Sequence, residues 1–254
     1  MRIEIWSDIA CPWCFIGKRR FETALDGFAH KDDVEVEWRS YQLDPSLPEH
    51  YAGTETEYLS QAKGMPAEQV RQMFDHVTAQ AAGEGLNYDF DSIVVANSFT
   101  AHRFLHLAKS HGVMNQAKEA LLSGHFEHGR NIGDVEYLAE VAQAVGIDAD
   151  EARRVLSTDE YTAEVKADIA EAQALGANGV PFFVIDRKYG ISGAQPPEAF
   201  TQALETAWGE SQKLTVLAGG DSGSGSTTSD GTTSGKGGDE AFRDGAVCGP
   251  EGCD

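Results

Sequence analysis

Two cysteines near the amino-terminal end, Cys11 and Cys14, are separated by Pro12 and Trp13. Residues 2–7 before them are typical of a strand, and residues 11–28 carry apolar side chains at helical spacing. Pro12 suits the first position of a helix, which places Cys11 at the helix cap, where free backbone N–H groups favour a thiolate. This context is typical of thiol–disulfide redox chemistry, with Cys11 as an exposed attacking thiolate of lowered pKa.

Two other interpretations of the pair are a structural cysteine pair and half of a zinc site. Zinc would need further ligands, and the remaining cysteines, Cys248 and Cys253, lie far away at the carboxyl-terminal end. Redox exchange needs only the two thiols. Cys11 forms a mixed disulfide with the substrate, and Cys14 then attacks Cys11 and releases the substrate. We therefore predict no metal at this motif, and protein or small-molecule thiols and disulfides as substrates.

Composition limits the partners and the compartment. The 254 residues include 41 acidic and 20 basic ones, a formal charge of −21, which disfavours nucleic acid and anionic membranes as partners. No apolar run approaches the ~18 residues of a membrane span, and no secretory leader precedes the first strand, so we expect a cytoplasmic protein. No glycine-rich nucleotide loop is present. We expect no cofactor beyond the redox disulfide, with glutathione or thioredoxin as candidate electron partners.

The hydrophobic pattern divides the chain into four parts. Residues 1–45 predict a strand, a helix and a parallel second strand over 34–43, and residues 177–212 predict a hairpin and a last helix. Residues 46–176 between them predict helices over 55–63, 66–82, 97–112, 114–128, 134–145, 150–156 and 159–175. Residues 213–254 are a polar linker ending in Cys-x4-Cys. The class is α/β, a thioredoxin-like fold with an all-helical insertion domain and a flexible C-terminal tail.

Four residues are expected to form the substrate-binding surface around the thiols. Trp13 carries no charge near neutral pH, so we expect it, with Pro12, to shield the site or contact apolar substrate. Val180 and Pro181 begin the first hairpin strand, which the fold sets beside the Cys-x-x-Cys loop. There the backbone of Val180 could pair with an extended substrate segment. The simpler alternative for Pro181 is an ordinary proline at a strand edge.

The tail pair, Cys248 and Cys253, also permits two interpretations. It could be a passive disulfide or an adventitious metal site on a disordered end. It could instead be a tethered second redox pair that exchanges with Cys11, because a linker of about 30 residues spans roughly 30 Å. We favour the second interpretation, which predicts a mixed disulfide between Cys11 and a tail cysteine.

Histidines at helical spacing could in principle hold a metal, but no carboxylate or cysteine pattern completes a site. The pairs are His102 with His106 and His125 with His128. We interpret them as surface or hydrogen-bonded core residues. Asn97, His102 and Arg103 could line the cleft between the insertion and the thioredoxin-like domain.

Several motifs together resemble a known family. They are residues 7–14, Asn97 with 101–103, 129–133, 179–183 and 190–195. In this order they resemble the cytosolic DsbA-like thiol–disulfide oxidoreductases of the FrnE type, over residues 1 to about 210. The resemblance implies a thioredoxin domain with a helical insertion, a cis bond before Pro181, and oxidoreductase or isomerase activity. Some FrnE-type members also carry a C-terminal Cys-x4-Cys. The Pro12-Trp13 dipeptide replaces the Pro-His of periplasmic DsbA, so a strongly oxidising potential is not implied.

Two other functions compete with this one. Kappa-like glutathione S-transferases and 2-hydroxychromene-2-carboxylate isomerases are similar to this chain in architecture, with helices inserted into a thioredoxin-like domain. They typically have serine at the position of Cys11 and lack the second cysteine. Cys11 and Cys14 together therefore favour disulfide exchange. The remaining alternative is a non-catalytic chaperone or a zinc-binding module.

Overall fold

The computed structural model of the chain describes residues 1–48 and 51–212, together with the backbone of residues 248–249 and 252–253. Its centre is a four-stranded sheet in the order β2-β1-β3-β4. β1 (Arg2–Ser7) runs parallel to β2 (Glu35–Ser40), whereas β3 (Phe182–Ile185) is antiparallel to both β1 and β4 (Tyr189–Ser192). This is the predicted α/β arrangement, a parallel unit and a hairpin joined in one sheet.

The second strand is shorter than the predicted 34–43. β1 ends at Ser7, where the chain turns into the cysteine motif, so residues beyond Ser40 have little strand left to pair with. The N–H of Tyr41 still reaches the carbonyl of Ser7, at 3.3 Å, but the N–H of Leu43 donates instead to the Asp8 carboxylate, at 2.7 Å. The motif itself therefore ends the parallel pairing.

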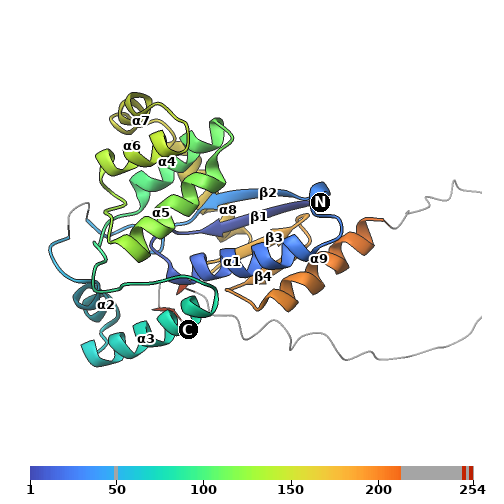
Figure 1. Cartoon of the computed structure of the whole chain (residues 1–254), viewed down its shortest axis with the longest axis horizontal. Coiled ribbons are helices and arrows are strands. Elements are labelled where there is room, and N and C mark those ends of the chain that lie inside the picture. Colours follow the sequence, from blue (N-terminus) through green and yellow to red (C-terminus); the bar gives the residue numbers. More distant parts are fainter. Residues whose placement is uncertain (49–50, 213–247, 250–251, 254) are drawn as a thin grey trace, which may run out of the picture.

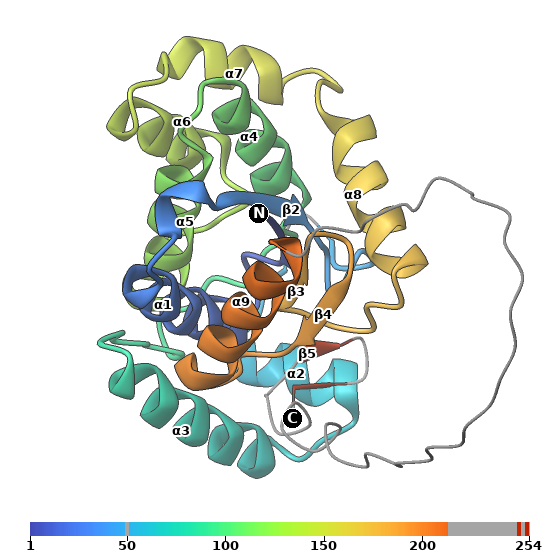
Figure 2. The ribbon, with the colours of Figure 1, turned by 90° about the vertical axis from the view of Figure 1, so that its right-hand side faces the viewer.

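Helices cover both faces of the sheet. α1 (Pro12–Gly27) and α9 (Pro197–Ser211) lie on one face, and α8 (Thr162–Ala174) lies on the other (Figures 1 and 2). α8 falls inside the range predicted for the insertion, yet it packs against the sheet. Trp6 Nε1 donates to the Asp168 carbonyl at 2.8 Å, and the Ser40 N–H donates to the Asp168 carboxylate at 2.9 Å.

The other helices form two groups beside this core. α2 (Glu55–Lys63) and α3 (Ala67–Gly83) lie near the amino-terminal end of α1. A separate lobe contains α4 (Phe99–Ser110), α5 (Met114–His128), α6 (Val135–Ala144) and α7 (Ala149–Leu156) (Figure 1). A short 3-10 turn, η1 (Lys31–Asp33), precedes β2. Among the residues that the structure describes, no helix is long and apolar enough to cross a bilayer.

α1 is fixed in place by an aromatic cluster and by one close approach. Phe21 of α1 packs against Phe183 of β3 and Phe200 of α9, with ring centroids 5.5 and 5.7 Å away. Where α1 passes the hairpin, Gly17 leaves no room for a side chain, because a Cβ there would lie 2.8 Å from Pro181 Cγ. The glycine thus allows the cysteine-bearing end of α1 to lie directly against the loop of Pro181.

Replacing Gly17 by alanine should destabilise the protein by about 1–3 kcal/mol, because the new methyl group overpacks the contact with Pro181. The matched control is Gly27→Ala in the same helix, where a Cβ would meet nothing within 4 Å. That change should be neutral or stabilising by at most about 1 kcal/mol. Urea unfolding of both variants measures the difference. Equal stability of the two variants would show that α1 and the Pro181 loop do not pack as described.

Candidate active site

The cysteine motif begins α1 as predicted. Cys11 is the N-cap residue in extended conformation, with φ −99° and ψ 113°, and Pro12 occupies the first helical position. The N–H of Cys14 donates to the Cys11 carbonyl at 3.0 Å, so the two residues share the first turn. Both cysteines are free thiols in this structure. The arrangement therefore holds a reduced dithiol at the amino-terminal end of a helix.

The expectation of an exposed Cys11 thiolate is wrong for this structure. Neither Cys11 nor Cys14 has any exposed surface. Burial raises the pKa of the Cys11 thiol well above its usual range, and the side chain of Cys14 acts in the same direction, although the backbone N–H of Cys14 acts against both. A helix N-terminus contributes at most about 2 kcal/mol to an anion, and here the loss of hydration outweighs it. Cys11 is thus a protonated, enclosed thiol.

The hairpin loop lies against Cys11. The Val180–Pro181 peptide bond is cis, as the family resemblance implies. Cys11 Sγ lies 3.6 Å from the carbonyl oxygen of Val180 and donates to it. Val180 has no exposed surface, and Pro181 is also buried. The structure therefore brings together two motifs that lie 169 residues apart in the sequence, and the Val180 carbonyl accepts its hydrogen bond from the thiol.

Two aromatic residues enclose the motif from the helical side. Trp13 is 3% exposed, and its ring lies 6.1 Å from that of His76 on α3, so it shields the thiols and does not face solvent. Tyr88 donates its hydroxyl hydrogen to the Pro12 carbonyl at 2.7 Å, and burial raises the pKa of this phenol well above its usual range. Tyr88 lies between the helices predicted over 66–82 and 97–112, where no local sequence pattern distinguishes it from its neighbours.

A buried carboxylate orders the loop that leads into the motif. Asp8 accepts hydrogen bonds from the N–H of Ala10 at 3.3 Å and of Leu43 at 2.7 Å, and it lies 3.1 Å from His102 Nε2. Burial alone would raise the pKa of Asp8, but the bonds from His102 and Leu43 lower it below its usual value. Asp8 therefore remains a carboxylate, and its charge adds to the cost of ionising Cys11.

The expectation of a cleft lined by Asn97, His102 and Arg103 is confirmed for two of the three residues. Asn97 and Arg103 line a pocket that the loop after β2 also borders, whereas His102 does not reach it. His102 is fully buried against Asp8, and Arg103 donates to carbonyl groups in the last turn of α7 and just after it, including that of Val155 at 2.9 Å. Asn97 accepts from the side chain of Gln42 and from the N–H of Phe99, so it orders the start of α4. These residues support the scaffold of the site.

The remaining histidines behave as the sequence interpretation states. His106 bonds to Ser40 and lies 3.1 Å from Asp168, and His125 is buried, whereas His128 is exposed. In residues 1–48 and 51–212, no cluster of histidine, cysteine and acidic side chains could hold a metal ion.

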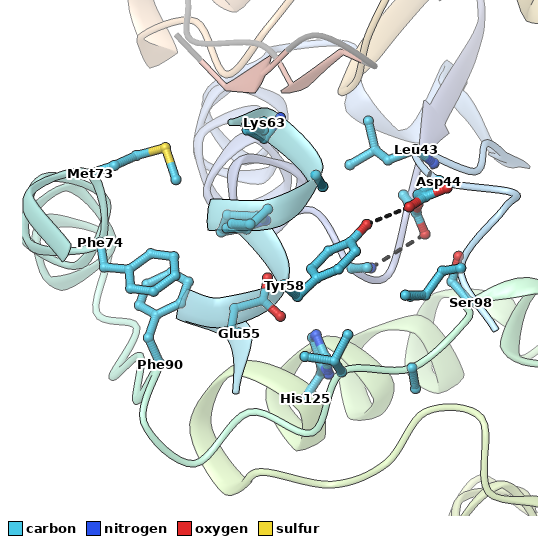
Figure 3. A pocket seen from close by; sticks show the side chains of 18 of the residues that line it. Leu43, Asp44, Glu55, Tyr58, Lys63, Met73, Phe74, Phe90, Ser98 and His125 are labelled. Atoms are coloured by element: carbon cyan, nitrogen blue, oxygen red, sulfur yellow. Dashed lines mark hydrogen bonds between the residues drawn. The ribbon is translucent and has the colours of Figure 1, made fainter. Parts of the chain in front are cut away.

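A pocket of about 450 Å³ borders the motif at Pro12 (Figure 3). One wall is α2, and the others come from the loops after β1 and β2, from α3, and from the segment between α3 and α4. Most lining side chains are apolar, among them Leu43, Leu59, Met73, Phe74, Val77 and Phe90. This volume suits a small ligand or one or two side chains of a peptide. Sequence reasoning missed the pocket, because its walls come from distant segments without a shared motif.

The polar groups of the pocket are mainly acidic. Tyr58 donates to the Asp44 carboxylate at 2.7 Å, and this bond, with those from Ser46, lowers the pKa of Asp44 despite its burial. Burial raises the pKa of Glu55 to about 7, and Glu55 forms no hydrogen bond or ion pair among the described residues. Burial also lowers the pKa of His125 to about 4, so this histidine is neutral at pH 7. The pocket therefore disfavours anions.

The tail cysteines are only partly described. The backbones of β5 (Cys248–Gly249) and β6 (Gly252–Cys253) pair antiparallel, with Cys248 opposite Cys253. Figures 2 and 3 place this small hairpin beside α2. The side chains of both cysteines, and the linker predicted for residues 213–247, lie outside the described part of the chain.

Comparison with known proteins defines the class. A family model, the DSBA-like thioredoxin domain, matches residues 2–205. The chain therefore belongs to the DsbA-like thioredoxin family, whose members include thiol–disulfide oxidoreductases.

Particular relatives agree with this class. This chain is similar to the crystal structure of the probable DsbA oxidoreductase SCO1869 from Streptomyces coelicolor, with 44% sequence identity and a TM-score of 0.81. The match covers 100% of this chain and 98% of SCO1869. YwbO, an uncharacterized protein of Bacillus subtilis, is 27% identical over 80% of this chain and 96% of its own length. The cytosolic disulfide reductase DsbM from Pseudomonas aeruginosa, with glutathione, shares the fold at 18% identity, over 82% of this chain and 99% of that one, with a TM-score of 0.55.

Proposed function

We propose that this protein is a cytoplasmic thiol–disulfide oxidoreductase of the FrnE type, and that Cys11 and Cys14 are its redox pair. The observation that carries the proposal is the pair of free thiols in the first turn of α1, with Cys11 Sγ 3.6 Å from the Val180 carbonyl beside a cis proline. A substrate disulfide accepts two electrons from the dithiol, first by forming a mixed disulfide with Cys11. Cys14 then displaces the substrate thiolate, which takes up a proton, and the Cys11–Cys14 disulfide remains.

The favoured direction is reduction of substrate disulfides. Stabilising the thiolate of a reduced pair makes that pair a stronger oxidant, as in DsbA. Here burial and the Asp8 carboxylate do the opposite to Cys11, because both raise its pKa. The reduced pair therefore lacks the thiolate stabilisation that makes DsbA an oxidant, so it donates electrons more readily. The cytosolic DsbM, which shares the fold, is a disulfide reductase by description. A thiol donor such as glutathione or a thioredoxin would return the pair to the dithiol.

The equilibrium of the Cys11–Cys14 pair against a glutathione buffer tests this direction. We expect a potential closer to the about −270 mV of thioredoxin than to the about −120 mV of DsbA, because the reduced form of this pair lacks thiolate stabilisation. The protein should carry serine at positions 248 and 253 so that only one pair titrates. Cys11→Ser should abolish insulin reduction, whereas Gly27→Ala should not. A potential near that of DsbA would contradict the reductase assignment.

Access to Cys11 is proposed to run through the pocket beside Pro12. Because Cys11 is fully buried, a wall must move before a substrate sulfur can reach it. α2 is the wall with the least to lose, since its residues, Glu55 included, are at most partly buried. Lys63, at the end of α2, lines the same pocket as Pro12, the residue that follows Cys11, and burial lowers its pKa. The acidic pocket then selects neutral or cationic disulfides over anionic ones.

This selection predicts a pH-dependent preference for the dication cystamine over the anion oxidised glutathione. Glu55 is largely protonated below pH 7 and ionised above it, so the preference should increase between pH 6 and pH 8. One charge at about 4 Å in water contributes about 1 kcal/mol, or about fivefold. Glu55→Gln should therefore reduce the ratio of kcat/KM for cystamine to kcat/KM for oxidised glutathione about fivefold at pH 8, and should hardly change this ratio at pH 6. The control Glu68→Gln removes the same charge from α3 outside the pocket. An unchanged ratio for Glu55→Gln at pH 8 would exclude this pocket as the entrance.

The tail cysteines are proposed to form a second redox pair that exchanges with Cys11. The support is the backbone register, which sets Cys248 opposite Cys253, and the position of this hairpin beside α2, the movable wall of the pocket. Electrons would pass between the pairs through a mixed disulfide of Cys11 with Cys248 or Cys253.

Single-cysteine variants should trap this species. In a protein that keeps Cys11 and Cys248, or Cys11 and Cys253, with the other two cysteines changed to serine, we expect an intramolecular disulfide on mild oxidation, detected by peptide mass analysis. Deletion of residues 220–254 should slow turnover several-fold, because the tethered pair is lost. The relay is wrong if no such crosslink forms and the deletion leaves turnover unchanged.

The kappa-like transferase and isomerase alternative is less well supported. Those enzymes were expected to lack the second cysteine, and here Cys14 shares the first helical turn with Cys11. No described feature favours a non-catalytic chaperone or a zinc module over exchange.

A further inference from the structure

Lys118 is a buried cation that the exchange described so far does not use. Its side chain lies on α5 with no exposed surface, and Nζ has no hydrogen-bond partner among the described residues. The indole ring of Trp38 faces it, with Nζ 5.0 Å from the ring centroid. Burying an ammonium group without a partner costs free energy that a methionine of similar length would not cost. A lysine in this place therefore needs a compensating interaction.

α5 is joined to α1 one turn beyond the redox pair, because Cys14 and Lys18 lie four residues apart on the buried face of α1. The residue after Lys118, Glu119, forms ion pairs with two residues of α1. Its carboxylate lies 2.7 Å from Lys18 Nζ and also contacts the guanidinium group of Arg19. Lys118, one position earlier, points into the interior instead. The negative charges that act on it most strongly are those of Cys14 and Asp8, followed by that of Cys11.

The surrounding charges leave Cys14 as the partner that changes during the reaction. Asp8 is already held by His102 and by the N–H groups of Ala10 and Leu43, so its charge is constant. Lys18, the other cation near Lys118, is paired with Glu22 at 2.6 Å and with Glu119. Burial lowers the pKa of Lys118 to about 8, so the ammonium form still predominates at pH 7 and is lost above pH 8.

We propose that Lys118 is a positioning residue whose ammonium group stabilises the thiolate of Cys14 in the resolving step. This inference deepens the proposed function and depends on it. In the mixed disulfide, the Cys14 thiol loses its proton, and its sulfur forms a bond to Cys11 Sγ. The bond between Cys11 and the substrate sulfur breaks, and the substrate leaves as a thiolate that takes up a proton. Lys118 keeps its own proton and lowers the energy of the Cys14 anion in a site without water.

The test separates the two steps with dithiodipyridine, an uncharged chromogenic disulfide, on the full chain with serine at positions 248 and 253. The first equivalent of pyridinethione reports attack by Cys11, and the second reports resolution by Cys14. Lys118→Met should leave the first rate within about twofold and slow the second about tenfold at pH 7, which corresponds to about 1.4 kcal/mol of lost thiolate stabilisation. The two proteins should converge above pH 9, where Lys118 itself has lost its proton.

Controls distinguish this role from a structural one. Lys118→Met should also be at least as stable to urea as the parent, because it removes an unpaired buried charge, whereas Lys31→Met at the surface should change neither rate nor stability. Lys118→Arg should restore much of the second rate. A Lys118→Met protein with an unchanged second rate and pH profile would overturn the inference. Failure of the proposed function itself would appear differently, as no release by the parent protein or release that survives Cys11→Ser.

Discussion

The complete enclosure of Cys11 is the physical constraint on which the other features of the site depend. It follows from packing on three sides: the Val180 carbonyl at 3.6 Å, the shielding ring of Trp13, and the hydroxyl of Tyr88 on the Pro12 carbonyl. None of these contacts could form if α1 were displaced, and α1 is held by the aromatic cluster of Phe21 and by its approach to Pro181 at Gly17. The fold thus sets the solvation of the thiol before any catalytic group acts on it.

Enclosure determines which protonation state of the Cys11 sulfur is favoured. In water, the amino-terminal end of a helix and its free N–H groups would favour a thiolate and hence an oxidising pair. Inside this site the loss of hydration is larger, and the fixed charge of Asp8 adds to it, so the thiol form is favoured. A protein of this kind must then solve two problems that an exposed motif does not have. It must admit a substrate sulfur, for which α2 is suited, and it must form the second thiolate in a dry interior, for which Lys118 is suited.

The sequence was sufficient for those features that depend on local patterns. Residues 2–7 and the helix that begins at Pro12 followed from periodicity and from the preference of proline for a first helical turn. The sheet followed from two separate strand signals and the handedness of the crossover. The burial of Cys11 did not follow, because it depends on Tyr88 and Trp13 being covered by helices far along the chain. Sequence reasoning applied the helix-dipole argument without the competing cost of desolvation.

Buried polar atoms without partners gather around the same helix end, and their distribution is informative. Among the described residues, such atoms include Trp13 Nε1, His125 Nδ1, Lys118 Nζ and His102 Nδ1. Trp13 belongs to the motif, His125 lines the adjacent pocket, Lys118 responds to the charge of Cys14, and His102 is bonded to Asp8. An unpaired buried polar group destabilises a fold by about 1–3 kcal/mol, so a concentration of them in one place is unfavourable for stability alone. Such groups are tolerated where polarity serves a reaction, and here the reaction must create and remove a negative charge on sulfur within the protein interior.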